Sequence, residues 1–328
     1  NMQPVWKSRI PPTVFALGVV SLLTDVSSEM IYPLLPIFLT AVLGAGPAFL
    51  GVIEGIAETT ASLLKFYAGW LSDRLRHRKP LVVAGYTLSA LTRPLVALAT
   101  AGWHVLIVRI LDRIGKGVRT SPRDALVAQV TPEDRWGLAY GLQRGMDHAG
   151  AIVGPLLAAA ILAWITEDYR TVFWLAFIPG FLSVAVLVLF VHEAPRAAGH
   201  PPTSIGAFTP DHGGSPACEG GEERRGKLEG LSPKPRLSSR GTGFTLRGFD
   251  GRFRRFLLVL LIFTLGNSSD AFLLLQAHAA GVTTAMLPLL WAAHHVIKAL
   301  FATRAGAISD RIDRRHMLAA GWTIYALI

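Results

Sequence analysis

Hydrophobic residues fall into long blocks along this chain, and the length of those blocks is what most limits its possible folds. A block of about 20 apolar residues is long enough to cross the ~30 Å hydrocarbon core of a membrane as a helix. Only 16% of the 328 residues are charged, whereas soluble domains carry about 25%. A soluble core is built from shorter, amphipathic segments instead. The sequence therefore predicts an all-α fold, a polytopic transmembrane helical bundle.

The first apolar block follows Lys7 and Arg9, as the core of a signal peptide would. However, it is longer than the ~7–15 residues of a signal peptide core, and it contains Asp25 and Glu29. We therefore interpret it as the first transmembrane helix. A ninth helix opens near residue 316, and the other blocks predict spans at residues 13–41, 47–71, 80–100, 103–122, 136–163, 169–191, 253–278 and 284–308.

The middle of the chain differs from the blocks on either side of it. Residues 192–252 are rich in Pro, Gly and charged residues and poor in apolar ones. Such a segment cannot bury enough surface to offset the entropy lost on ordering. We expect three regions: an N-terminal six-helix transmembrane bundle (1–191), a flexible cytoplasmic linker (192–252) and a partial C-terminal transmembrane bundle (253–328).

Lys and Arg are concentrated on one side of the predicted spans. The basic loops are those after the second, fourth and eighth spans, with Arg74, Arg76, Arg78 and Lys79, then Arg119, Arg123 and Arg135, then Arg311, Arg314 and Arg315. The loops at 43–48, 100–104 and 279–284 contain no Lys or Arg. Since cytoplasmic loops carry such an excess, we expect a multi-pass protein of the inner (plasma) membrane with a cytoplasmic N-terminus. The same asymmetry accounts for the net charge of +10 without nucleic acid as a partner.

Sequence motifs of enzymes and metal sites are absent. Cys218 is the single cysteine, which excludes a disulfide framework and a multi-cysteine metal site. The chain has no phosphate-binding Gly loop, no nucleophile elbow and no His/Glu metal motif within a span. We expect no enzymatic activity, no catalytic residues, no bound cofactor and no metal.

One motif occurs twice, at the cytoplasmic ends of the second and eighth spans. Each copy has the form Gly-x-x-Ser-Asp-Arg followed by basic residues, and its key positions are Gly69, Asp73, Arg74 and Arg78 in the first copy and Gly306, Asp310 and Arg311 in the second. Parallel repeats of this kind are how one class of transporter builds two halves around a site at the membrane midplane.

The repeated motif resembles the signature loop of the major facilitator superfamily. In the fifth span, Gly150, Gly154 and Pro155 resemble the Gly-x-x-x-Gly-Pro motif of the proton-coupled exporters in that family. Arg113 and Gly117 in the fourth span resemble the Arg-x-x-x-Gly motif of the same branch, which comprises drug:proton antiporters of prokaryotes. The resemblance covers nearly the whole chain. Gly-x-x-x-Gly also serves plain helix packing, which remains an alternative for Gly150 and Gly154.

The resemblance implies two pseudo-repeated six-helix halves that give alternating access to a central site. The two signature loops would act as a conformational latch, in which Asp73 and Asp310 accept hydrogen bonds from a helix N-terminus or pair with Arg. A proton gradient would supply the energy, and the partners would be a small-molecule substrate, protons and the lipid bilayer, with the protein a monomer. Twelve helices need about 400 residues, so we expect a chain that ends at Ile328 to be a fragment, a truncated product or an incompletely determined protein.

Ionisable residues within the predicted spans are the candidates for the transport site. An ionisable side chain at the bilayer centre costs at least ~2.5–3.5 kcal/mol on insertion scales, so we expect these residues to face a cavity or one another. The substrate and proton-coupling candidates are Asp25, Glu29, Glu54, Glu58, Arg109, Asp112, Arg113, Asp147 and Asp270.

Asp25 and Glu29 are the preferred pair, because a spacing of four residues places them on one face of the first helix. We expect them to exchange protons and recognise a substrate cation opposite Arg113. Neighbouring charges change the proton affinity of a cavity carboxylate, so movement of a substrate can bind or release a proton. Permanent structural pairs remain the alternative for Glu58 with Lys65 and for Arg144 with Asp147. His294 and His295 are alternatively plain cavity-lining groups, and Tyr32-Pro33-Leu34-Leu35-Pro36 is a kink or a gate.

The leading functional hypothesis is a secondary transporter that exports a small solute by proton-coupled efflux, as an antiporter. Proton-linked uptake of a metabolite or metal chelate is an alternative, since direction depends on the Gly-Pro motif alone. A non-transporting membrane sensor or scaffold is another, although a scaffold has no reason to retain buried charges. The sequence identifies neither the substrate nor its charge.

Overall fold

The computed structural model describes residues 11–75, 77–132, 135–193, 251, 255, 258–259, 270–309 and 319–324, with side chains as far as residue 299 and again from residue 319. Every regular element in these ranges is a helix. Residues Gly199–Ser268 separate from the rest as a second unit, and nearly all of them lie outside the described residues. The predicted linker and most of the seventh span therefore lie outside the described part of the chain. Of the ninth helix, only residues 319–324 are described.

The first span is interrupted at its prolines. Helix α1 (Pro12–Ile31) is followed by a 3₁₀ turn, η2 (Tyr32–Leu34), a short α2 (Leu35–Ile37) and a π-helical turn, η3 (Phe38–Val42). Pro33 and Pro36 have no backbone N–H, so regular α-helical hydrogen bonding cannot continue through them. The helix is thus broken where the sequence predicts a kink.

The next three helices follow the predicted spans at their start but not all at their end. They are α3 (Pro47–Arg74), α4 (Lys79–Thr92) with its 3₁₀ extension η4 (Arg93–Leu98), and α5 (Gly102–Val130).

The predicted end of the fourth span at residue 122 is wrong, because α5 continues past Pro122 to Val130. Arg119 and Arg123, which the sequence pattern assigns to a loop, therefore lie inside this helix. The Arg119 side chain is buried and donates to Ser89 Oγ at 2.7 Å. Arg123 donates to Ser21 Oγ at 2.9 Å. These hydrogen bonds let a charged stretch remain helical between its neighbours.

The remaining described helices are α6 (Trp136–Trp164), α7 (Tyr169–Leu175), α8 (Phe177–Phe190), α10 (Asp270–Ala279), η7 (Thr284–Met286) and α11 (Leu287–Ser309). They match the predicted spans within one or two residues, except at the start of α10, where most of residues 253–269 lie outside the described part of the chain. Asp168 caps α7, since its carboxylate accepts from the backbone N–H of Arg170 at 3.1 Å.

Within the described residues, four segments are long and apolar enough to cross a membrane: Pro12–Val42, Lys79–Leu98, Trp136–Trp164 and Tyr169–Phe190. Helices α3 and α5 have the length but carry many ionisable residues, such as Glu54 and Glu58 on α3 and Arg109 and Asp112 on α5. The apolar blocks at 47–71 and 103–122 predict these two helices, but their ionisable residues set them apart from the four segments above.

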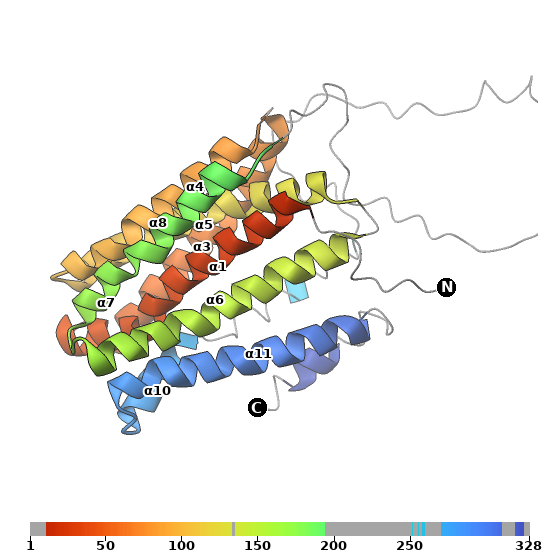
Figure 1. Ribbon diagram of the computed structural model, residues 1–328. Coiled ribbons are helices and arrows are strands. Elements are labelled where there is room, and N and C mark those ends of the chain that lie inside the picture. Colours follow the sequence, from red (N-terminus) through yellow and green to blue (C-terminus); the bar gives the residue numbers. More distant parts are fainter. Residues whose placement is uncertain are drawn as a thin grey trace, which may run out of the picture. The chain divides into compact units, whose positions relative to one another are not determined.

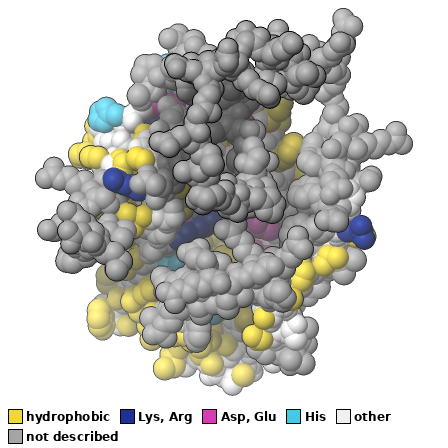
Figure 2. Space-filling model, turned by 90° about the vertical axis from the view of Figure 1, so that its right-hand side faces the viewer, with side chains coloured by type: hydrophobic (Ala, Val, Ile, Leu, Met, Phe, Trp, Pro, Cys, Tyr) yellow, Lys and Arg dark blue, Asp and Glu magenta, His cyan; other side chains and the backbone are white. Residues whose placement is uncertain are grey.

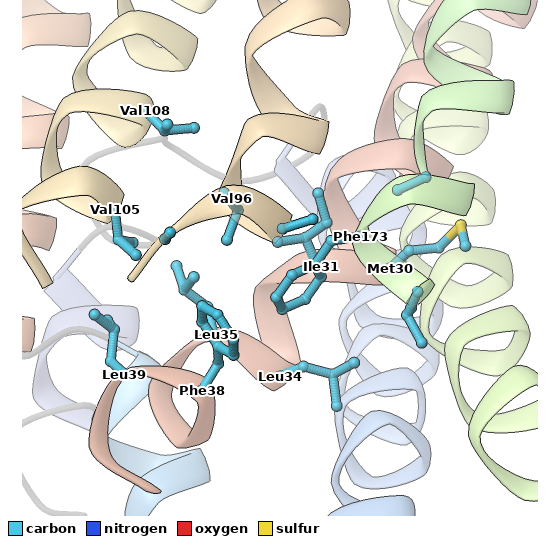
Figure 3. Packing of buried hydrophobic residues seen from close by; sticks show 14 of the residues in the cluster. Met30, Ile31, Leu34, Leu35, Phe38, Leu39, Val96, Val105, Val108 and Phe173 are labelled. Carbon is cyan, nitrogen blue, oxygen red and sulfur yellow. The ribbon is translucent and has the colours of Figure 1, made fainter. Parts of the chain in front are cut away.

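Helix α1 packs against α6 and α8, and α5 packs against α3 and α4. Figure 1 shows α6 between α1 and α11, in agreement with the contacts that α6 makes to both. The largest hydrophobic cluster lies around the broken end of the first span, and Figure 3 shows Leu34, Phe38, Val105 and Phe173 among its members. The rings of Phe38 and Phe173 meet edge to face at 5.1 Å. This packing fixes the end of α1 that follows Asp25 and Glu29.

Candidate functional site

Helix α1 presents Asp25 and Glu29 directly against the glycine face of α6. A Cβ atom built on Gly150 would lie 2.5 Å from the Leu22 carbonyl oxygen and 3.0 Å from Asp25 Cβ. A Cβ atom on Gly154 would lie 2.7 Å from the Val26 carbonyl oxygen and 3.0 Å from Glu29 Cβ. Each glycine thus lets the backbone of α6 approach α1 behind one of the two acids. Pro155 is buried within α6 immediately after this contact.

The two acids are half-buried, and neither forms an ion pair with a described residue. Glu29 instead accepts a hydrogen bond at 2.7 Å from Nε1 of Trp291, which lies on α11. The indole of Trp291 also lies against the ring of Tyr32, with centroids 5.1 Å apart. An indole N–H can only donate, so this contact holds one Glu29 oxygen as an acceptor.

Cations of α5 act on the two acids through their charge. Lys116 and Arg119 act electrostatically on Asp25, and Lys116 and Arg113 act on Glu29. The Nε of Arg113 is buried and has no hydrogen-bond partner among the described residues. Of the two acids, Glu29 is the one on which Arg113 acts, whereas the cations that act on Asp25 are Lys116 and Arg119. The expectation that both acids lie opposite Arg113 stays a prediction.

Asp147 on α6 adds a third carboxylate beside Asp25. It lies 3.5 Å from Arg144, whose side chain is 72% exposed. Since an exposed ion pair contributes little, this pair does not remove Asp147 from the electrostatics of the acids on α1. Clustered carboxylates with cations nearby form an arrangement whose proton affinity depends on every charge that enters or leaves it.

Two other acids are held in buried ion pairs. Arg109 donates to Glu54 at 2.6 Å, linking α5 to α3. Arg93 donates to Asp112 at 3.0 Å, with both side chains under 10% exposed. Arg93 also donates to the backbone carbonyl of Thr24 at 2.8 Å, which ties this pair to α1.

The remaining candidates differ in their surroundings. Glu58 is exposed and forms no ion pair with Lys65 or any other described residue, although its charge acts on Lys116. Asp270 lies 3.1 Å from Lys298, and both side chains are 43% exposed. Neither ring nitrogen of His295 has a hydrogen-bond partner among the described residues. No group of three or more His, Cys, Asp or Glu in the described ranges is placed to hold a metal ion.

The first signature loop is held together around Arg78. Its guanidinium donates to Asp73 at 3.3 Å and to the Ala125 carbonyl at 3.2 Å. The backbone N–H groups of Arg78 and Lys79 both donate to the Glu193 carboxylate, at 2.8 to 2.9 Å, where α4 begins. These contacts join α3, α4 and α5 to the segment that follows α8.

Other positions of the signature loops take no part in this network. Arg74 lies over the ring of Trp70 at 3.8 Å, and a Cβ on Gly69 would have ordinary contact with Ser121. In the second copy, Gly306 lies in α11, whereas Asp310 and Arg311 lie outside the described residues.

Sequence reasoning missed Arg93, Lys116, Trp291 and Glu193. Arg93 and Lys116 carry a signal, because each is a cation within a predicted span. Trp291 has none, since an aromatic residue in an apolar helix is ordinary. Glu193 lies at the end of a span, where a carboxylate is usually solvated, and only tertiary structure shows that it caps α4.

Figure 2 shows the face on the right-hand side of Figure 1. Near its middle, dark blue Lys or Arg and magenta Asp or Glu side chains lie close together, while yellow hydrophobic side chains cover much of its lower part. Side chains of both charges are therefore visible on this face.

Known proteins resemble this chain over different lengths. An uncharacterized MFS-type transporter of Methanocaldococcus jannaschii is 30% identical over 326 residues, 98% of this chain and 72% of that protein. An uncharacterized protein of Mycobacterium tuberculosis is 35% identical over 188 residues, 56% of this chain and 44% of that protein. The multidrug resistance protein MdtH of Photorhabdus laumondii is 30% identical over 154 residues, 47% of this chain and 37% of that protein. The chain thus matches less than half the length of the last two.

A bacterial homolog of the human lysosomal transporter Spinster, solved in an inward-facing and unoccupied conformation, has a similar fold. The TM-score is 0.64 at 17% identity, over 94% of this chain and 64% of that one. The model of the Major Facilitator Superfamily matches residues 17–328, and the chain therefore belongs to that family.

Proposed function

We propose that this protein is a secondary transporter that exports a small organic solute by proton-coupled alternating access. The observation that carries the proposal is the placement of Asp25 and Glu29. These two half-buried acids form no ion pair with a described residue, pack on the glycine face of α6 and lie within the electrostatic influence of cations of α5. Acids in such a place are costly to keep in a membrane. A role in exchanging a proton for substrate would explain why they are present.

The acids can link proton and substrate through competition. Lys116 and Arg113 act on Glu29, so an arriving substrate charge changes the field that these groups share. In the exchange we propose, a proton leaves a carboxyl group as a cationic or zwitterionic substrate binds. A proton from the opposite side of the membrane then displaces the substrate. One proton moves inward for each substrate released outward in this simplest form.

The contact between Glu29 and Trp291 can link that exchange to a change of conformation. Trp291 lies on α11, which belongs to the second repeat, and Glu29 lies on the first helix of the chain. A hydrogen bond to a carboxylate is roughly twice as strong as one between neutral groups. Protonation of Glu29 therefore weakens a contact between the repeats, which favours their separation at this point.

The direction of transport rests on similarity. MdtH, which matches part of the chain, is named as a multidrug resistance protein, and the Gly150–Pro155 motif resembles that of proton-coupled exporters. Both favour export. Proton-linked uptake remains the second candidate, because the same acids would serve a symporter. A sensor or scaffold is disfavoured, since neither needs buried acids that form no ion pair with a described residue.

Proton movement in everted membrane vesicles tests the proposal. Respiration sets up a pH gradient with the vesicle lumen acidic. Lipophilic cations, sugars, organic acids and metal chelates are then added one at a time. Export predicts that one class of compound dissipates the gradient in vesicles with the protein, and that Asp25→Asn and Glu29→Gln each abolish the response.

The matched control is Glu167→Gln, which neutralises an exposed acid between α6 and α7. It should leave the response unchanged. Dissipation that persists in both Asp25→Asn and Glu29→Gln would contradict the role given to the acids. No response to any compound, from protein shown to be folded and inserted, would overturn proton-coupled export and favour uptake or the sensor.

A further inference from the structure

A long groove runs along the outside of the first half, between α4 and α8. Its volume is about 930 Å³, and its walls include Val83, Thr87 and Leu91 of α4 and Val188 of α8. The groove is separate from the acids of α1. Its volume is within the ~300–1,000 Å³ typical of sites for small molecules.

Except for Thr87, the polar side chains that line this groove gather at one end. His77, Lys79, His192 and Glu193 lie there, at the beginning of α4 and just past the end of α8. Both oxygens of Glu193 already accept backbone N–H groups of Arg78 and Lys79, so this carboxylate is held at the beginning of α4 and needs no further donor. Lys79 donates one hydrogen bond, to the Val188 carbonyl at 2.9 Å, and its ammonium has two further donors. The polar end therefore offers donors and positive charge to an anion.

The length of the groove matches one leaflet of a membrane. Twelve residues separate Lys79 from Leu91, and at ~1.5 Å per residue the α-helical rise spans about 18 Å. One leaflet contributes about half of the ~30 Å hydrocarbon core. The groove is apolar over this distance and has its basic end on the side that the Lys and Arg distribution assigns to the cytoplasm. That leaflet is the one that carries anionic lipids.

Exposed apolar side chains border the groove. Leu91 is 55% exposed, Val188 47% and Leu189 65%. In a chain that belongs to a family of membrane transporters, such a surface faces hydrocarbon, and a cleft in it is filled by an acyl chain because water there is costly.

We propose that the groove between α4 and α8 is a binding site for one anionic phospholipid of the cytoplasmic leaflet. The phosphate lies at Lys79 and His77, and one acyl chain lies along α4 from Ala84 to Leu91. The bound lipid then covers the point where Glu193 caps α4, beside the first signature loop. This site does not depend on which solute the protein carries or on whether transport uses protons.

Native mass spectrometry of the purified protein tests the site. The protein is reconstituted in vesicles of phosphatidylethanolamine with phosphatidylglycerol, extracted in mild detergent and scanned for retained lipid. The wild type should retain one phosphatidylglycerol in preference to phosphatidylethanolamine. In the double variant His77→Gln, Lys79→Gln the fraction of protein that retains phosphatidylglycerol should fall at least about fivefold, since each basic group near an anionic lipid contributes to its binding.

Two further variants separate the groove from general surface charge. Ala84→Trp fills the groove at an exposed position without changing charge, and it should lose the lipid as well. If thermal unfolding shows that Ala84→Trp does not fold, Leu91→Trp at the far end takes its place. Arg135→Gln removes a cation outside the groove and should retain the lipid fully.

Equal retention of both lipids by the wild type would overturn the proposal, as would retention by a folded groove-filling variant. Lipid that binds only after removal of residues 200–250 would show that the chain's own linker occupies the groove, which also overturns it.

Discussion

The acids of α3 and α5 and the acids of α1 are chemically alike but are treated differently by the fold. Glu54 and Asp112 each lie within about one hydrogen-bond length of an arginine, at 2.6 Å and 3.0 Å, in surroundings that are nearly closed to water. Asp25 and Glu29 have cations in their neighbourhood but form no ion pair with a described residue. The first two have an ion-pair partner, and under the proposed function the last two would exchange theirs.

Buried charge alone therefore does not identify a transport site. An ion pair with good geometry compensates the cost of burial within the protein, and such a pair can stay closed while the protein works. An acid that lacks a permanent partner needs a proton or a ligand to compensate its charge. Substitutions of the paired acids should therefore cost stability, whereas substitutions of the acids of α1 should cost little.

Asp112→Asn should be the most damaging substitution, because it leaves the Arg93 guanidinium buried beside a neutral amide. Removal of one partner from a buried pair costs about 3–5 kcal/mol. We expect a loss of that size in the free energy of unfolding, measured by chemical denaturation in detergent micelles.

The double variant Arg93→Gln, Asp112→Asn serves as the control for that loss. It removes the uncompensated cation, so it should be more stable than Asp112→Asn alone, as a double-mutant cycle would record. A cost below about 1 kcal/mol for Asp112→Asn would show that the pair is weakly coupled, and the contrast with the acids of α1 would fail.

Gly154→Ala should have the next largest effect, because its methyl group would lie 2.7 Å from the Val26 carbonyl oxygen of α1. Overpacking of this kind costs about 1–3 kcal/mol. Gly145→Ala is the matched control on the same helix, since its Cβ would have no atom within 4 Å. Alanine is the better helix former, so the control should gain up to about 1 kcal/mol. Equal effects at both positions would mean that α6 does not pack on α1 through its glycine face.

Trp291→Phe removes the donor to Glu29 while keeping an aromatic ring. A hydrogen bond to a charged group contributes about 1.5 kcal/mol or more, so the balance between conformations should move at least about tenfold towards separation of the repeats. Val42 and Met286 are 46% and 56% exposed, so each can be replaced by cysteine and spin-labelled in a Cys218→Ser background. Double electron–electron resonance would then report the change as a larger fraction of long distances between the two labels.

Trp164→Phe is the control for Trp291→Phe, because Trp164 is 85% exposed and makes no contact with the site. It should leave the distance distribution unchanged. An unchanged distribution in Trp291→Phe as well would show that the Glu29 contact does not hold the repeats together.

Most helix positions could be predicted because apolar length is a local property of the sequence. The end of α5 could not, because the stretch around Arg119 and Arg123 looks like a cytoplasmic loop. Hydropathy carries no information about the hydrogen bonds that Ser89 and Ser21, on other helices, accept from these arginines. A tertiary contact thus decided where the helix ends.

The candidate site could be predicted in part for the same reason. A spacing of four residues places Asp25 and Glu29 on one face, and the Gly150–Pro155 motif indicates close helix packing, but neither states that the two features meet. The partners of Glu54 and Asp112 depend on how α3, α4 and α5 are arranged. Trp291 is separated from Glu29 by most of the chain, so only the packed structure reveals their hydrogen bond.

Asp25→Asn should have the smallest effect on stability, although the proposed function requires Asp25 for transport. The substitution keeps the shape of the side chain and breaks no ion pair with a described residue, so the free energy of unfolding should change by no more than about 0.5 kcal/mol. The measurement is the same denaturation in micelles as for Asp112→Asn, on protein prepared side by side. A small change here beside a large one for Asp112→Asn means that the fold does not depend on the charge of Asp25, and lost transport in Asp25→Asn is then a loss of function in a folded protein. A cost as large as that of Asp112→Asn would place Asp25 among the structural acids, and the role of the α1 pair in coupling would have to rest on Glu29 alone.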